Sequence, residues 1–293
     1  MDDLRALCRQ VGLDPSRVTH TEMIHERHGN RLYRIMCGRQ SFVLKWFGIP
    51  EEATEVRSYA LLEGLGVPTL PVHGRTGQAL LLEDLLASPL WRLAREEDVD
   101  RPDVGTAVAE WYLAFHAAGR EMLRGDARIP GFLGREVDAL TGESIRAAGW
   151  QLELADNPVW ALAAAHIEAI KAAMRSLSET LNDNDFHWTN LALSRQEPLR
   201  AIVFDYHLLG IGPAYCDCRN VAGSLGEGAA RAFRDVYGPE DERERLLDEA
   251  TAPLVALIAA LRLPRFPRWA EGCLRTVKRG ELEAGIRRAL DVV

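Results

Sequence analysis

L-N-D-N-D-F-H-W-T-N-L-A-L, residues 181–193, decides the fold together with A-I-V-F-D-Y-H, residues 201–207. The first stretch places Asp185 five residues before Asn190 and then becomes apolar, and the second ends an apolar run at Asp205. Phosphoryl transfer needs a carboxylate that deprotonates the acceptor hydroxyl, and oxygen ligands that hold Mg²⁺ against the nucleotide phosphates. These three side chains can meet both needs at one cluster of loops. Alone, the pattern also fits a polar turn beside a β-hairpin, because Asn and Asp are common turn residues.

The same stretches resemble the catalytic loop and metal-binding strand of the aminoglycoside phosphotransferase and choline kinase-like family, within the protein-kinase-like superfamily. That family reads roughly H-G-D-x-x-x-x-N, followed by a hydrophobic strand that ends in Asp. The resemblance implies that Asp185 is the catalytic base and that Asn190 and Asp205 are the metal ligands. The match departs at Asp183 and Asn184, which replace the family's His and Gly. A second Asp so close to the base could compete for metal or raise the pKa of its neighbour.

Upstream, V-L-K at 43–45 resembles the strand lysine that contacts the α- and β-phosphates in this fold. Glu55 follows ten residues later, and its spacing to Gly66 fits the family's E-x-x-x-L-x-x-L-x-x-x-G-V-P. The resemblance implies an ion pair between Lys45 and Glu55 that holds the ammonium group for the phosphates. Read alone, the two residues are a surface lysine and a Glu favoured by a helix start.

The nucleotide base is expected at L-L-L-E-D-L, residues 80–85, which resembles the hinge of the family. There the carbonyl of Glu83 and the amide of Leu85 would pair with adenine. The phosphate-covering loop, residues 28–31, contains one glycine, and Asn30 lies where many relatives carry Asn before the next strand. The resemblance therefore makes Asn30 a further nucleotide-binding residue.

Three features are interpreted as structural or remain open. His116, in an L-A-F-H stretch similar to the family's L-A-x-L-H helix, is expected to hydrogen-bond rather than catalyse. Asp217 matches the Asp of the family's G-D-P-A-x-D stretch and would brace the catalytic loop. Charged candidates for acceptor binding are Glu110, Asp217, Glu240, Asp241, Arg120, Arg231 and Arg234.

The residue pattern and the resemblance together predict an α+β protein with a two-lobed, protein-kinase-like fold. A small β-rich N-lobe is expected at residues 1–84, and a larger, mainly helical C-lobe at residues 85–293. Apolar periodicity predicts strands at 31–37, 41–47 and 78–85, helices at 51–66, 104–119 and 157–181, and a compact β-like segment at 186–210.

The composition and charge of the chain limit the classes of protein to which it could belong. The formal net charge is −8, so the basic footprint usual for nucleic-acid binding is missing. No run of 18 apolar residues suggests a membrane span, and the charged start lacks the apolar core of a secretory signal, which favours a cytoplasmic protein. The five cysteines are odd in number and irregularly spaced, which argues against a disulfide framework and against zinc. The pattern leaves the oligomeric state open.

The function implied by the resemblance is an ATP- and Mg²⁺-dependent kinase that phosphorylates a hydroxyl of a small molecule. A cationic acceptor, such as an aminoglycoside or an amino-alcohol, is the first expectation, and homoserine or a sugar stays open. A catalytically silent kinase-like protein that binds nucleotide or a partner is the alternative, although the catalytic and metal-binding set is complete. A protein kinase is disfavoured because no A-P-E-type activation segment follows Asp205.

Overall fold

The computed structural model describes residues 2–27, 29–50, 53–125 and 129–293. Its chain forms two compact units. The first unit comprises Met1–Ala118, Asp185–Leu209 and Asn220–Gly238, and the second comprises Gly119–Asn184, Gly210–Arg219 and Pro239–Val293. The lobe boundary predicted between residues 84 and 85 lies inside the first unit and stays a prediction.

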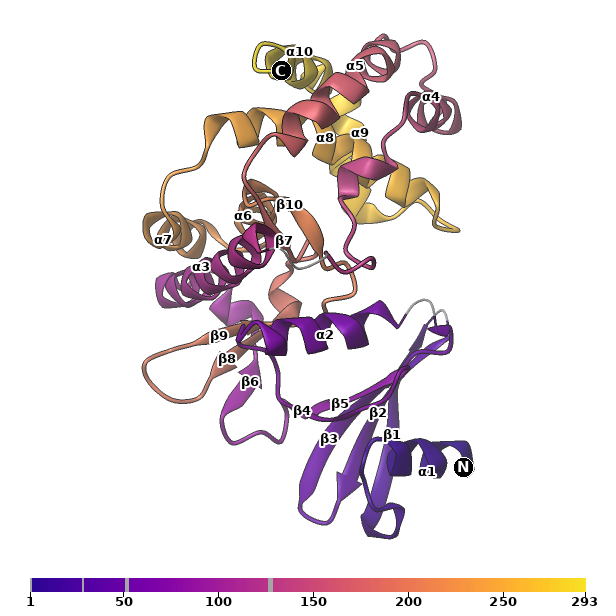
Figure 1. Ribbon diagram of the computed structural model, residues 1–293, viewed down its shortest axis with the longest axis vertical. Helices are drawn as coiled ribbons and strands as arrows, with labels where there is room; N and C mark the ends of the chain where they lie inside the picture. The colour runs from indigo at the N-terminus through magenta and orange to yellow at the C-terminus, as the bar shows by residue number, and fades with distance from the viewer. Residues whose placement is uncertain (1, 28, 51–52, 126–128) are drawn as a thin grey trace. The chain divides into compact units, whose positions relative to one another are not determined.

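The first unit begins with a helix and a five-stranded antiparallel sheet in the order β1-β2-β3-β5-β4 (Figure 1). These elements are α1 (Asp2–Gln10), the 3₁₀ turn η1 (Pro15–Arg17), β1 (Val18–Arg27), β2 (Asn30–Cys37), β3 (Gln40–Trp46), β4 (Val72–Arg75) and β5 (Ala79–Glu83). The side chains of β3 alternate between two environments, as the pleat of a strand requires. Phe42 and Leu44 pack with Cys8 of α1, whereas Val43 and Lys45 line a cavity on the opposite face.

A helix between β3 and β4 carries polar side chains into the interior of the first unit. This helix, α2 (Thr54–Gly64), buries Glu55 and Tyr59 among its apolar residues. It ends where Gly66 adopts a positive φ of 72°, a conformation that glycine reaches at no steric cost. The helix therefore presents Glu55 from its first turn to the strand that carries Lys45.

A second, three-stranded sheet of the first unit has the order β6-β8-β9. It consists of β6 (Trp91–Leu93), β8 (Leu191–Ser194) and β9 (Ala201–Val203). β8 and β9 form an antiparallel hairpin, so the chain that leaves Asn190 returns to Asp205. The hairpin thus brings the two predicted metal ligands to the same end of the sheet.

Two helices of the first unit lie against each other (Figure 1). They are α3 (Pro102–Arg124), which continues into the second unit, and α7 (Glu227–Tyr237). A Cβ atom on Gly105 would lie 2.0 Å from the carbonyl oxygen of Ala229. Only glycine therefore permits this close approach of the two helices.

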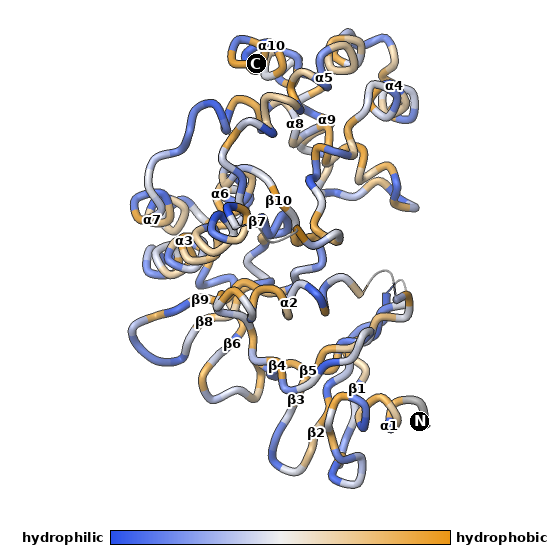
Figure 2. The backbone as a smooth tube through the Cα atoms, in the orientation of Figure 1, coloured by the Kyte–Doolittle hydropathy of each residue, from blue (hydrophilic) through white to orange (hydrophobic). Residues whose placement is uncertain are grey.

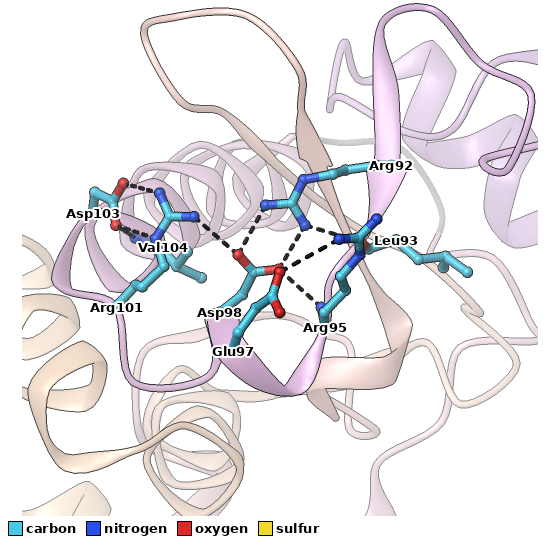
Figure 3. A network of polar contacts seen from close by, with 8 residues as sticks. All are labelled: Arg92, Leu93, Arg95, Glu97, Asp98, Arg101, Asp103 and Val104. Atoms are coloured by element: carbon cyan, nitrogen blue, oxygen red, sulfur yellow. Dashed lines mark hydrogen bonds and ion pairs between the residues drawn. The ribbon is translucent and has the colours of Figure 1, made fainter.

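The start of α3 is fixed by a buried carboxylate (Figure 3). Asp98, in the 3₁₀ turn η3 (Glu96–Asp98), is 1% exposed. The guanidinium of Arg92 donates to both carboxylate oxygens at 2.6 and 2.8 Å, and Arg101 donates at 3.0 Å. The backbone N–H of Arg95 adds a fourth bond at 2.9 Å. A bidentate arginine of this kind makes strong, charge-assisted hydrogen bonds, so Asp98 ties β6 to the helix that follows.

The second unit is mainly helical. Its elements are the 3₁₀ turns η4 (Glu136–Ala139) and η6 (Arg268–Ala270), the helices α4 (Gly142–Gln151), α5 (Val159–Arg175), α8 (Glu242–Leu261), α9 (Glu271–Lys278) and α10 (Glu281–Leu290), and the paired strands β7 (Glu179–Asn182) and β10 (Gly210–Pro213). The helix α6 (Tyr215–Ser224) crosses from this unit into the first. Apolar and polar residues alternate around α4 and α10 (Figure 2), and the apolar faces of these helices join one core.

Most elements agree with the sequence prediction, with one correction. The predicted hairpin at 31–37 and 41–47 is confirmed as β2 and β3. The helix predicted over 157–181 is wrong at its C-terminal end, because it stops at Arg175 and residues 179–182 form β7. Pairing with β10, 30 residues further along the chain, overrides the local helical pattern there.

Three further features complete the description. In the described part of the chain no helix is both long and apolar enough to cross a bilayer. All five cysteines are free thiols, which confirms that they build no disulfide framework. Among the described residues, no group of three His, Cys, Asp or Glu side chains is arranged to hold a metal ion.

Candidate active site

A cavity of about 350 Å³ in the first unit collects most of the predicted nucleotide-binding residues. Its walls include residues of β1, β2, β3, β5 and β6, of α2, and of the segments that follow β5 and β9. The predicted residues that line it are Asn30, Lys45, Glu55, Glu83, Leu85 and Asp205. This cavity combines apolar strand residues with a few converging polar groups, as small-molecule sites generally do.

The segment after β5 is held by a buried carboxylate that the sequence analysis did not single out. Asp84 accepts hydrogen bonds from Arg34 Nε at 2.9 Å, Ser41 Oγ at 2.6 Å and the backbone N–H of Leu86 at 3.1 Å. In the described part of the chain no acceptor takes the neighbouring N–H of Leu85. The one amide predicted to pair with adenine is therefore left available in a fixed loop.

Asn30, at the start of β2, has an amide oxygen that is buried without a hydrogen-bond partner among the described residues. Leaving a buried acceptor unsatisfied costs about 1–3 kcal/mol. Because this oxygen belongs to a residue that lines the cavity, a hydroxyl or amino donor of a bound ligand would remove that cost.

Lys45 carries the cationic group of the cavity. Its ammonium forms an ion pair with Glu55, as the sequence analysis predicted, and a second with Asp205, 2.7 Å from Oδ1. Burial lowers the pKa of Lys45, but the two carboxylates outweigh burial and raise it to about 12. Burial also raises the pKa of Glu55, which is 1% exposed, to about 7 against the opposing charge of Lys45. The ammonium is thus a fixed positive charge between two acidic groups.

Asp205 lies two residues after the end of β9, in a left-handed conformation with φ of 73°. The residue after it anchors this turn, because Tyr206 is fully buried and packs edge-on against Tyr59 and parallel to Trp111. Burial tends to raise the pKa of Asp205, but the hydrogen bond from His207 and the charge of Lys45 hold it well below its usual range. Asp205 therefore stays ionised, as a metal ligand must be.

The residues predicted to form the catalytic loop, in the first unit, lie on the turn η5 (Trp188–Asn190) and just before it. Asn190 Nδ2 faces the carbonyl oxygen of Asp185 at 3.5 Å, and the carbonyl of Asn190 accepts the N–H of Phe204 at 3.0 Å. These contacts join the loop to the segment before Asp205. Burial raises the pKa of Asp185 above its ordinary value, which the charge of His207 opposes. A carboxyl with a raised pKa is a better proton acceptor near neutral pH.

His207 is a member of the site that the sequence analysis missed. Its Nδ1 lies 3.4 Å from Asp205 Oδ1, and its Nε2 lies 3.9 Å from Asp185 Oδ2. Burial lowers its pKa, but the hydrogen bond to Asp205 and the charges of both carboxylates raise it to about 9. The available signal was its place two residues after Asp205 in F-D-Y-H.

The oxygen atoms of Asn190 and Asp205 fit the magnesium site that the sequence implies. The Nδ2 atom of Asn190 is turned toward the Asp185 carbonyl, so the amide oxygen is directed elsewhere. The ionised carboxylate of Asp205 supplies a second hard oxygen. Mg²⁺ in proteins is commonly bound through one or two side-chain oxygens together with substrate phosphates.

Several other residues that the sequence analysis singled out lie outside the cavity. Asp217, in the second unit, is buried and accepts the backbone N–H groups of Asp183 and Asn184 at 3.0 Å each, as a brace would. Asp183 is itself 1% exposed. In the first unit, His116 is fully buried and its Nδ1 lies 2.7 Å from Tyr237 Oη. Of the acceptor-binding candidates, the exposed ones are Glu110, Glu240, Asp241, Arg231 and Arg234.

Comparison with known proteins places this geometry in context. A sequence model described as the phosphotransferase enzyme family matches residues 21–248. A comparison with curated protein sequences finds no match.

Solved structures with the same fold include kinases of small alcohols and of an antibiotic. A choline/ethanolamine kinase family protein from Mesorhizobium loti has 15% identity and a TM-score of 0.63, over 98% of both chains. Choline kinase LicA from Streptococcus pneumoniae has 13% identity and a TM-score of 0.62, over 97% of both chains. Macrolide 2'-phosphotransferase MphH from Brachybacterium faecium has 16% identity and a TM-score of 0.59, over 94% of this chain and 98% of that one. At these identities the likeness concerns the fold, and it confirms the predicted kinase-like class.

Proposed function

Because this chain belongs to the phosphotransferase enzyme family, we propose that it transfers the γ-phosphoryl group of ATP to a hydroxyl group of a small molecule, with Asp185 as the base. The observation that carries the proposal is the placement of Lys45 between Glu55 and Asp205 at the cavity beside the segment after β5. A lysine held by a helix glutamate is the arrangement that kinases use to bind nucleotide phosphates.

The nucleotide would bind in the cavity of the first unit. The backbone of Glu83 and Leu85 would contact the adenine edge, and Asn30 would accept a hydrogen bond from the nucleotide. Lys45 would exchange its contact with Asp205 for the phosphate oxygens while Glu55 keeps the ammonium in place. Each of these groups lines the cavity.

Asn190 and Asp205 would hold Mg²⁺, which neutralises charge on the phosphates when bound. Asp205 is held ionised by its neighbours, so this ligand needs no deprotonation step. Asp185 would accept the proton of the acceptor hydroxyl while the phosphoryl group transfers. Most of the rate gain in such a reaction comes from positioning and from charge neutralisation.

The acceptor is proposed to be a small hydroxyl compound that carries an amino group, such as an amino-alcohol or an aminoglycoside. Two arguments support a cationic compound. The net charge of the chain is −8, which favours the approach of a cation. Choline kinase LicA, which has the same fold, is named for a cationic alcohol.

The experiment that tests this function is ATP turnover, read as ADP release, with Mg²⁺ and a panel of aminoglycosides, amino-alcohols, sugars and homoserine. Release that depends on one class of acceptor, with a phosphorylated product seen by mass spectrometry, is the expected result. A protein that fails to bind Mg-ATP in calorimetry would overturn the proposal.

A further inference from the structure

The ring of His207 lies between two carboxylates that have separate predicted tasks. Nδ1 faces Asp205, and it lies 3.4 Å from the Oδ1 atom and 3.3 Å from the backbone carbonyl oxygen of Asp205. Nε2, on the opposite side of the ring, lies 3.9 Å from Asp185 Oδ2. One side chain therefore spans the gap between the proposed metal ligand and the proposed base.

The two carboxylates are not equally well held. In the absence of nucleotide, Asp205 Oδ1 also contacts the ammonium of Lys45 at 2.7 Å, so the carboxylate of Asp205 has a second charged partner besides the ring. Within the described part of the chain, His207 is the one residue whose side chain lies within ion-pair distance of the Asp185 carboxylate. A base must keep its oxygen pointed at the proton that it removes, and an unheld carboxylate rotates about its side-chain bonds.

The distance of 3.9 Å between His207 Nε2 and Asp185 Oδ2 is too long for a hydrogen bond, but a small movement would bring the two atoms within hydrogen-bonding distance. Catalytic hydrogen bonds are often long in the absence of substrate and shorten in the reacting complex. The Nδ1 contacts place the ring so that Nε2 already points to Asp185. A small rotation of the Asp185 carboxylate closes the gap.

We propose that His207 is a positioning residue for the phosphoryl transfer, whose Nε2 holds the carboxylate of Asp185 while its Nδ1 is seated on Asp205. This inference rests on the proposed role of Asp185 as the base. It assigns the two ring nitrogens different tasks, and the two tasks can be separated by substitution. The nitrogen of an Asn side chain occupies a place near Nδ1, whereas that of Gln reaches the place of Nε2.

The test compares His207→Asn with His207→Gln in the full chain. With Mg-ATP and the acceptor of the panel that is turned over fastest, His207→Asn should lower kcat roughly 10- to 100-fold with KM for ATP within about twofold. His207→Gln should recover most of that loss, because its amide reaches Asp185. Hydrolysis of Mg-ATP by water, read as phosphate release, gives the same comparison with water as the acceptor. His20→Asn, on an exposed part of β1, is the matched control and should behave as wild type.

Equal kcat values for the Asn and Gln variants would overturn the inference, and so would a kcat of wild-type size in both. Mg-ADP affinity, measured on both variants, should stay at its wild-type value, and thermal unfolding should show that both variants are folded. A loss of nucleotide affinity in His207→Asn would assign His207 to binding instead and would also overturn it. Asp185→Asn, measured in parallel, separates the two claims. If Asp185→Asn keeps wild-type turnover, the proposed base is wrong. If Asp185→Asn is inactive and both His207 variants keep wild-type turnover, only the inference about His207 is wrong.

Discussion

The ammonium of Lys45 lies 2.7 Å from the carboxylate of Asp205, although 160 residues separate the two in the sequence. The contact joins β3 to the turn after β9, and both belong to the first unit. It was not predicted, because the sequence indicated only the local partner Glu55. In the absence of nucleotide, the lysine is thus neutralised from two sides, and phosphate oxygens would replace one of the carboxylates.

Lys45→Met should weaken Mg-ATP binding at least about tenfold and also destabilise the fold. Glu55 is 1% exposed, and the loss of Lys45 leaves its buried carboxyl group without that partner, which costs about 1–3 kcal/mol. Urea unfolding should therefore show a lower free energy of unfolding for Lys45→Met. The double variant Lys45→Met/Glu55→Gln should recover much of the stability but none of the affinity. Identical stability of the single and double variants would argue against the buried pair.

Asp98→Asn should destabilise the first unit by about 3 kcal/mol at neutral pH, because Arg92 and Arg101 lose a buried charged partner (Figure 3). The hydrogen bonds from Arg92 lower the pKa of Asp98 below its ordinary value. The stabilisation is therefore complete above the pKa of the unfolded chain, about 3.9, and is lost as the pH falls through the lower folded value.

The measurement is urea unfolding of wild type and Asp98→Asn at several pH values. The difference between them should be constant from pH 7 to pH 5 and should shrink below about pH 4. Arg231→Gln is the control, because the ion pair between Arg231 and Glu227 is exposed on both sides and exposed ion pairs contribute less than about 1 kcal/mol. A difference that persists unchanged at pH 3 would contradict the assignment of the carboxylate.

Gly105→Ala should destabilise the protein by about 3 kcal/mol, because its Cβ would lie 2.0 Å from the Ala229 carbonyl oxygen and would push α3 away from α7. Gly64→Ala, at the end of α2 with no atom within 4 Å of the new Cβ, should instead stabilise by about 0.5–1 kcal/mol. Thermal unfolding of the two variants measures the contrast. Equal melting temperatures would mean that the two helices do not approach closely.

Local patterns predicted much of the first unit. Runs rich in strand-forming residues identified β2 and β3, a continuous apolar run identified β5, and a change to helical spacing identified α2. The ion pair between Lys45 and Glu55 followed from the family pattern, because both residues lie on adjacent elements with fixed spacing. The cavity of the first unit brings together residues of the predicted hinge, the predicted strand lysine and the predicted metal-binding Asp.

What the sequence did not reveal depends on contacts between distant segments. The alanine-rich periodicity of α5 continues into residues that pair as a strand with β10, so local spacing alone favoured a longer helix. His207 was read as part of a β-like segment, because its role appears only when Asp185 and Asp205 are seen on either side of it. Asp84 and Asp98 look like surface acids in the sequence, and their arginine partners became visible only in the folded chain.

The measurement that tests the central claim most directly is a single-turnover assay of wild type and Asp185→Asn with Mg-ATP and the acceptor that gives the fastest turnover in the panel. The account predicts a rate at least about 100-fold lower for Asp185→Asn. Its Mg-ADP affinity and melting temperature should match wild type, because Asp185 lies outside the residues that line the cavity proposed to bind the nucleotide. Phosphoryl transfer by Asp185→Asn at the wild-type rate would contradict the account.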